Sequence, residues 1–230
     1  MAGFMLSLPD LGATRDLRPM AKKKLIIMVS SAVYGIEELL DRIYAVLTEY
    51  GYDVWMSHKG TVPVISTKSA FDNCLSAVEQ CDLFLGLITP QYGSGTEAGA
   101  LSITHREMML AIEMNKPRWF LAHDHVVFAR TLLYNVGYKN PKERATLTLR
   151  RNTVFGDLRV IDMYEAAIRH EVNLQDRAGN WVQKYVSVED ALLYASAQFH
   201  RYQEVERFLE EHLKDVQAVR VTAGEKRDED

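Results

Sequence analysis

Apolar residues in the first half of the chain alternate between short continuous runs and longer stretches with helical spacing. Four runs have the length and apolar content of buried strands: 25–29, 52–56, 82–88 and 118–122. Between them, apolar residues recur every three or four positions over 36–50 and 68–80, which predicts two helices. Because strands that alternate with helices form parallel sheets, the pattern predicts an α/β, flavodoxin-like core of four or five parallel strands.

The pattern becomes less regular after residue 122. Helices are predicted at 126–136 and 187–213, and segment 172–186 predicts two strands around an Asp-Arg-Ala-Gly-Asn turn. The sheet is therefore expected to be followed by a mainly helical C-terminal extension. The chain divides into four expected parts: a flexible extension over 1–23, an α/β nucleotide-binding-like domain over 24–150, a mainly helical extension over 151–214 and a disordered tail over 215–230.

Composition narrows the classes of partner. The net charge is −4 and no basic stripe dominates, so we expect no binding to a nucleic acid duplex. No apolar run approaches the ~18–20 residues that a membrane span needs, and the first twenty residues lack the charge pattern of a signal peptide. The two cysteines, Cys74 and Cys81, have neither disulfide-framework nor zinc spacing, which favours free thiols. We expect a cytoplasmic protein.

Glu107 is the main candidate for chemistry. It follows the run at 82–88 and a glycine- and serine-rich loop, near the start of a helix predicted from Thr104. A carboxylate there lies above the carboxyl edge of a parallel sheet, where open α/β folds bind ligands. The spacing from Thr104 to Glu107 also fits a capping box, in which the glutamate only stabilises the helix start. Both interpretations remain open from the residues alone.

The stretch EMMLAIEMNKP at 107–117 resembles the E-x-G-x-A-x-x-x-G-K-P stretch of nucleoside deoxyribosyltransferases. This chain keeps the acid, the alanine and the Lys-Pro pair, and it has Met109 and Asn115 in place of the two glycines. The resemblance implies that Glu107 is a nucleophile that attacks the anomeric carbon of a sugar.

The resemblance extends through KLIIMVSS, a Cys-Asp strand before QYG, and SIT-x-x-E. Together these segments resemble a bacterial family that groups with deoxyribosyltransferase-like and TIR-like domains, which often accompany signalling or defence proteins. The similarity covers roughly 24–122, less than half of the chain. The tryptophan that many TIR-like enzymes carry before their glutamate is not found here.

Two loops at the same expected edge could bind a ligand. The loop after the first run has short hydroxyl side chains and free N–H groups before a helix, which suits a phosphate or a ribose diphosphate. The second loop contains a tyrosine that could stack on a base. No G-x-G-x-x-G or Walker lysine is present. The candidate ligand-binding residues are Ser30, Ser31, Tyr34, Tyr92, Gly93, Ser94 and Thr104.

No metal or cofactor is expected. His123 and His125 alternate around Asp124, but no third or fourth ligand follows at a fixed spacing. His105 and Arg106 flank Glu107 and could contact a phosphate or lie exposed in the first turn of the helix.

The leading functional hypothesis is an N-glycosidic-bond hydrolase or transferase that acts on a nucleoside, a nucleotide or an NAD-like ligand. The alternative is a non-catalytic TIR-like module that senses a nucleotide or binds a protein. The expected partner is a nucleotide-like small molecule, and a homo-oligomer is left open.

Overall fold

The structure is a computed structural model that describes residues 24–95, 100–149 and 154–212. The expectations for a flexible extension over 1–23 and for a disordered tail over 215–230 lie outside the described residues.

A five-stranded sheet forms the centre of the chain, with strand order β2-β1-β3-β4-β5. All four neighbouring pairs run parallel, which confirms the predicted α/β, flavodoxin-like architecture. The strands are β1 (Ile26–Ser31), β2 (Asp53–Trp55), β3 (Leu83–Ile88), β4 (Arg118–His123) and β5 (Val182–Tyr185).

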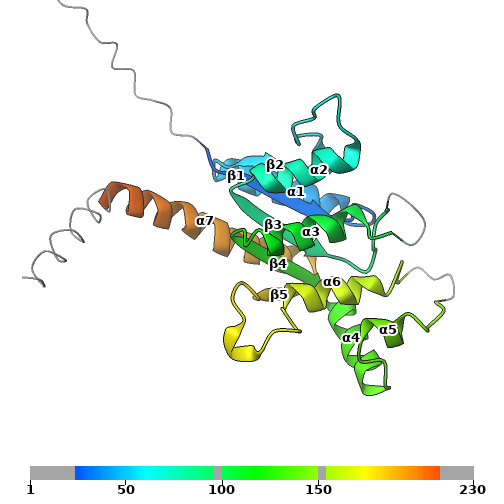
Figure 1. Ribbon diagram of the computed structural model, residues 1–230. Helices are drawn as coiled ribbons and strands as arrows, with labels where there is room; N and C mark the ends of the chain where they lie inside the picture. The colour runs from blue at the N-terminus through cyan, green and yellow to red at the C-terminus, as the bar shows by residue number, and fades with distance from the viewer. Residues whose placement is uncertain (1–23, 96–99, 150–153, 213–230) are drawn as a thin grey trace, which may run out of the picture.

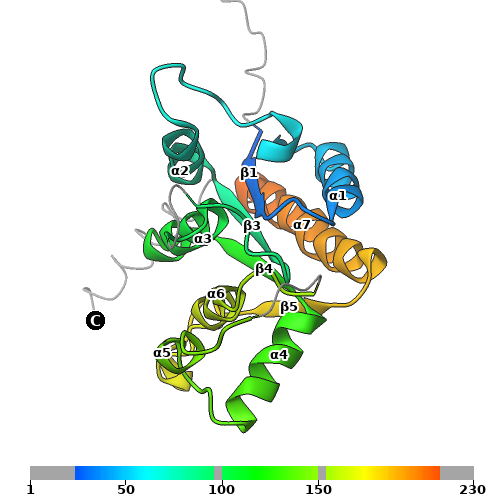
Figure 2. The ribbon, with the colours of Figure 1, turned by 90° about the vertical axis from the view of Figure 1, so that its right-hand side faces the viewer.

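Helices cover both faces of the sheet (Figure 1). They are α1 (Glu37–Glu49), α2 (Ala70–Gln80), α3 (Ile103–Glu113), α4 (Asp124–Asn135), α5 (Pro141–Arg144), α6 (Arg159–Ala167) and α7 (Val188–His212). Figure 2 shows α1 and α7 on one side of the sheet and α2, α3 and α6 on the other. Among these helices, none has both the length and the apolar character needed to cross a membrane.

The alternation of side chains along each strand divides the core between the two faces. In β3, Leu83, Leu85 and Leu87 pack with α1 and α7, while Phe84 and Ile88 pack with α2, α3 and α6. Every residue of β3 is buried because this strand lies at the centre of the sheet and both of its faces are covered. The continuous apolar run at 82–88 reflects this position.

The segment after residue 150 is mainly helical, as expected, since it contains α6 and α7. It also supplies β5, which was not expected to join the sheet and which pairs with β4 at its edge. The first of the two strands expected within 172–186 is instead a 3-10 turn at Leu174–Asp176. The second of the expected strands is β5, which pairs in parallel with β4, so the two expected strands do not form a hairpin.

Helix α7 packs onto the same core as α1. Phe199 is fully buried, and its carbonyl oxygen accepts a 2.7 Å hydrogen bond from the Tyr52 hydroxyl. The rings of Tyr52 and Phe199 also meet edge to face. Residues of β1, α1 and α7, which are far apart in the sequence, thus share one hydrophobic cluster.

Candidate functional site

A cleft lies at the carboxyl edge of the sheet, between the loops that follow β1 and β3. These loops diverge because α1 returns over one face and α3 over the other, which makes this the topological switch point of the fold. The cavity has a volume of about 570 Å³, within the usual range for small-molecule sites. Its lining residues are Ser31, Ala32, Val33, Tyr34, Ser57, Gln91, Tyr92, Gly93, Ser94, Ile103, Thr104, Gly156, Asp157 and Arg159.

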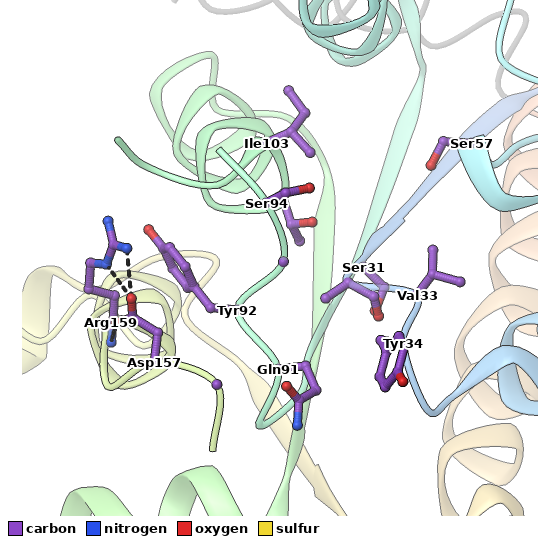
Figure 3. A pocket seen from close by; sticks show the side chains of 14 residues that line it. Ser31, Val33, Tyr34, Ser57, Gln91, Tyr92, Ser94, Ile103, Asp157 and Arg159 are labelled. Carbon is purple, nitrogen blue, oxygen red and sulfur yellow. Dashed lines mark hydrogen bonds and ion pairs between the residues drawn. The ribbon is translucent and has the colours of Figure 1, made fainter. Parts of the chain in front are cut away.

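The structure brings most of the predicted ligand-binding residues to this cleft. Six of them line it: Ser31, Tyr34, Tyr92, Gly93, Ser94 and Thr104. Figure 3 shows Ser31 and Tyr34 on one side of the cavity and Tyr92, Asp157 and Arg159 on the other. The seventh predicted ligand-binding residue, Ser30, and the catalytic candidate, Glu107, are buried and are not among the residues that line it.

Tyr34 and Tyr92 differ in what they offer a ligand. Tyr34 is 81% exposed at the rim, so its ring is open to a planar partner. Tyr92 is only 4% exposed, and the Arg159 guanidinium lies 4.3 Å from the centre of its ring. The base-stacking role that the sequence predicts for Tyr92 therefore suits Tyr34 better.

The wall beside Tyr92 is fixed by an ion pair. Arg159 donates to Asp157 Oδ2 from Nε at 2.9 Å and from Nη2 at 2.6 Å. Its Nη1 donates to the carbonyl oxygen of Ala100 at 2.8 Å, which ties the start of α6 to the loop before α3. Because these contacts hold the guanidinium in one plane, Arg159 shapes the wall of the cleft.

His105 lies behind the same wall rather than in the exposed position considered from the sequence. Its side chain is buried, and Nδ1 lies 2.8 Å from the Tyr92 hydroxyl. Burial, reinforced by the charge of Arg159, lowers the pKa of His105 to about 4. The imidazole is therefore neutral at pH 7 and adds no positive charge for a phosphate.

Four lining residues lie outside the two loops considered from the sequence: Ser57, Gly156, Asp157 and Arg159. Ser57 follows β2, and the other three precede or begin α6, on the far side of the expected boundary at residue 150. The one local signal for them is a Gly-Asp pair before a helical pattern, which marks a helix start but no cleft.

The start of α3 differs from the expected capping box. The helix begins at Ile103, and the Ser102 side chain caps it by accepting a 3.2 Å hydrogen bond from the His105 N–H. Thr104 is therefore the second residue of the helix, and Glu107 lies in its second turn. The capping interpretation of Glu107 is wrong because an earlier serine already satisfies the helix end.

The carboxylate of Glu107 instead reaches β1. The Ser30 hydroxyl donates to Glu107 Oε2 at 2.5 Å, and both side chains are almost fully buried. Burial raises the pKa of Glu107 to about 7, and hydrogen bonds from Ser30 and Cys74 partly oppose this rise. At neutral pH the group is thus poised between its two protonation states, which is a common property of catalytic carboxylates.

The two positions where glycines are replaced fit the fold. Asn115 follows the end of α3 with φ of 50°, and asparagine is the best non-glycine residue for this left-handed conformation. Met109 is partly exposed on α3. Lys116 donates to the carbonyl oxygens of Glu79 and Cys81 and so ties the end of α2 to the end of α3. This part of the motif is structural.

Metal ligation has no candidate in the described part of the chain, where no three His, Cys, Asp or Glu side chains are grouped. His123 instead caps α4, since its Nδ1 accepts a 3.1 Å hydrogen bond from the His125 N–H.

Two solved structures have partly similar folds. A 2-deoxyribosyltransferase from the psychrotolerant bacterium Bacillus psychrosaccharolyticus is 22% identical, with a TM-score of 0.29, over 42% of this chain and 72% of that one. A conserved protein from Enterococcus faecalis V583 is 13% identical, with a TM-score of 0.39, over 76% of this chain and 99% of that one. At these values the likeness concerns the fold alone.

No curated protein matches the chain at a significant level. Among protein families, the one described as "Domain of unknown function (DUF4062)" matches residues 26–175. The matched segment includes the first four strands, α6 and every residue that lines the cleft. Because this match spans well over half of the sequence, the chain belongs to the DUF4062 family.

Proposed function

We propose that the chain binds a nucleoside- or nucleotide-like ligand in the switch-point cleft and that Glu107 acts on its N-glycosidic bond. The observation that supports this most is the buried Glu107 carboxylate, with a pKa near 7, next to residues that line the cleft. Ser30 precedes Ser31, and Glu107 follows Thr104 by one helical turn. The acid therefore lies directly below the cleft floor.

The lining suits a sugar with an attached base. Hydroxyl and amide side chains of Ser57, Gln91 and Ser94 can exchange hydrogen bonds with sugar hydroxyls. The exposed ring of Tyr34 can stack on a base, as aromatic side chains do in nucleotide sites. Gly93 has φ of 79° and lets the loop backbone approach the floor closely.

The proposed reaction uses Glu107 in its ionised form. The carboxylate attacks the anomeric carbon as the bond to the base breaks, and the electron pair of that bond leaves with the base, which takes a proton from water. Water then hydrolyses the glycosyl ester and regenerates the carboxylate, or a second base accepts the sugar. Glu107 must turn from Ser30 toward the cavity to reach the sugar, since it does not line the cleft as described.

A second candidate is a non-catalytic TIR-like module that binds a nucleotide signal in the same cleft. The position of Glu107 below the lining favours this candidate, because a buried acid that never reaches the ligand would only hold β1 and α3 together. The two functions predict the same binding and differ in turnover.

The test is to incubate the protein with nucleosides, nucleotides and NAD and to measure released base by chromatography. Thermal stabilisation by each compound reports binding independently of turnover. Glu107→Gln should retain binding and lower turnover by ~10²-fold or more, the loss expected for one preorganised electrostatic group.

Glu113→Gln is the matched control, because Glu113 is an exposed glutamate on the same helix. It should leave both readouts unchanged. Binding without release of base in the wild type supports the module, and equal turnover in wild type and Glu107→Gln excludes Glu107 from the chemistry. No stabilisation by any compound argues against both candidates.

A further inference from the structure

A second cavity lies at the carboxyl edge of the sheet, next to the loop that follows β1. Its volume is about 410 Å³, which is enough for a small molecule. It is lined by 35–39 at the start of α1, by His123 and Tyr185 at the ends of β4 and β5, and by 186–188 at the start of α7. The main cleft reaches this loop at Tyr34, so the loop borders both cavities.

The start of α1 supplies hydrogen-bond donors to this cavity. The first hydrogen bond of the helix runs from the Leu40 N–H to the Ile36 carbonyl oxygen at 3.0 Å, and no side chain caps the helix. The N–H groups of 37–39, which all line the cavity, therefore have no hydrogen-bond partner among the described residues. Such N–H groups at a helix start bind acceptor oxygens.

The start of α7 on the opposite wall is already satisfied. The N–H groups of Val186 and Ser187 both donate to Asp190 Oδ2 at 3.2 Å, and the Asp190 N–H donates to the Ser187 hydroxyl at 3.2 Å. The free backbone donors of this cavity thus come from α1.

Tyr185 is a second and independent sign of a ligand. Its side chain is 3% exposed and lines the cavity, and its hydroxyl has no hydrogen-bond partner in the described part of the chain. A buried hydroxyl without a partner is unfavourable, because it has lost its hydrogen bonds to water. An acceptor oxygen bound in the cavity would satisfy it.

His123 adds one more donor beside Tyr185. The two rings meet edge to face with their centres 5.3 Å apart. Nδ1 of His123 accepts a hydrogen bond from the His125 N–H, so the ring proton of the neutral imidazole is on Nε2. Burial and the neighbouring His125 lower the pKa of His123, which keeps the ring neutral at pH 7.

The charges around the cavity disfavour an anion. Among the described residues that line it, Glu37 and Glu38 are the ones with ionised side chains. Both are exposed in the first turn of α1, where they already compensate the positive end of the helix dipole. A bound phosphate or carboxylate would face these two acids without a lining cation to offset them. Donors in an environment without net positive charge suit a neutral acceptor.

We propose that this cavity is a second binding site, for a small neutral molecule whose carbonyl or hydroxyl oxygens accept hydrogen bonds from the first N–H groups of α1 and from the Tyr185 hydroxyl. The site does not involve Glu107 and does not depend on the proposed function.

The first test is the stability of the ligand-free protein. Tyr185→Phe removes only the unpartnered hydroxyl, so the midpoint of urea unfolding should stay at the wild-type value or rise. Tyr52→Phe is the matched control, because the equally buried Tyr52 hydroxyl donates to the Phe199 carbonyl oxygen at 2.7 Å. Its midpoint should fall. An equal fall in both variants would show that the Tyr185 hydroxyl already has an internal partner and would overturn the proposal.

The second test is a titration of the nitrogen-15-labelled protein with uracil and with ribose as neutral probes. At least one of them should move the backbone amide signals of 37–39 in a saturable way. Tyr185→Phe should weaken this binding about fivefold, as expected for the loss of one hydrogen bond, and Tyr52→Phe should bind as the wild type does.

Three outcomes of the titration would overturn the proposal. Shifts confined to the Gly93 and Ser94 signals would place the probes in the main cleft. Equal affinities in wild type and Tyr185→Phe would remove Tyr185 from the site. If neither neutral probe moves the signals of 37–39, the site does not bind a neutral acceptor. In that case movement by inorganic phosphate would identify an anion site instead.

Discussion

The Ser30 hydroxyl and the Glu107 carboxylate form a 2.5 Å hydrogen bond between residues 77 positions apart in the sequence. This bond joins the end of β1 to the second turn of α3, and Ser31 and Thr104, which neighbour the pair along β1 and α3, line the cleft. The partner of Glu107 is therefore a side chain on a distant strand and not the backbone N–H at the start of its own helix.

The ionisation of Glu107 should make stability depend on pH. Its folded pKa of about 7 lies above its ordinary value of 4.5, so the folded state binds more protons between these values. The free energy of unfolding should therefore fall as pH rises from about 4.5 to about 7, by up to ~3 kcal/mol. Below this range the contribution of Glu107 is fully present.

Urea unfolding of wild type and Glu107→Gln at a series of pH values checks this prediction. The lowered pKa of His105 acts in the opposite sense, because the unfolded state then binds more protons. His105 is unchanged in the variant, so the difference between the two proteins isolates Glu107. Parallel stability curves for the two proteins would contradict the raised pKa.

Ser30→Ala should destabilise the protein most where Glu107 is ionised. The change removes a buried donor to a charged group, which costs about 1.5–3 kcal/mol. At low pH the protonated carboxyl loses less, because the hydroxyl favours the charged form. Ser31→Ala is the control, since the neighbouring hydroxyl only bonds the carbonyl oxygen of Ala32. Equal losses at both ends of the pH range would show that Ser30 acts through packing alone.

Tyr34→Ala should weaken ligand binding without loss of stability. The ring is exposed at the rim, and base stacking on an aromatic side chain contributes about 1–3 kcal/mol. Tyr34→Phe keeps the stacking surface and should bind nearly as well as wild type. Isothermal titration with the compound that stabilises the protein most gives the affinities. A large loss in Tyr34→Phe would instead indicate that the hydroxyl contacts the ligand.

Asn115→Ala should cost about 1 kcal/mol of stability, and Asn115→Gly should cost nothing or stabilise slightly. The backbone at this position has φ of 50°, where an alanine side chain is strained and glycine is not. The midpoint of urea unfolding for the three proteins measures the effect. An alanine variant as stable as the glycine variant would mean that the end of α3 relaxes out of this conformation.

Phe199→Ala should test whether α7 belongs to the central core. The side chain is fully buried with Tyr52, and removal of a core phenylalanine costs about 3–5 kcal/mol. Leu193→Ala is the control on the same helix, because Leu193 is 73% exposed and its loss should cost less than ~0.5 kcal/mol. Similar midpoints of urea unfolding for the two variants would contradict the packing described for α7.

Much of the fold is predictable from local pattern. The continuous apolar run at 82–88 predicts a buried central strand. In the structure both faces of β3 are covered, and for this reason apolar residues occupy both of its faces. The helices and strands up to His123 follow from the same reasoning, with ends shifted by one or two residues. The loops after β1 and β3 were predicted to meet because the carboxyl ends of parallel strands share one edge.

The sequence by itself determined which segments up to His123 are strands and helices and which loops reach the carboxyl edge, because burial imposes a period of two or 3.6 on neighbouring residues. Only the tertiary structure decided the partner of Glu107. Local spacing shows neither that Ser102, five residues before Glu107, caps α3 nor that Ser30 on a distant strand donates to the Glu107 carboxylate. It also decided that β5 joins the sheet and that Asp157 and Arg159 complete the cleft. Pairing between strands and packing between helices depend on residues far apart in the chain, and a local period contains no information about such distances.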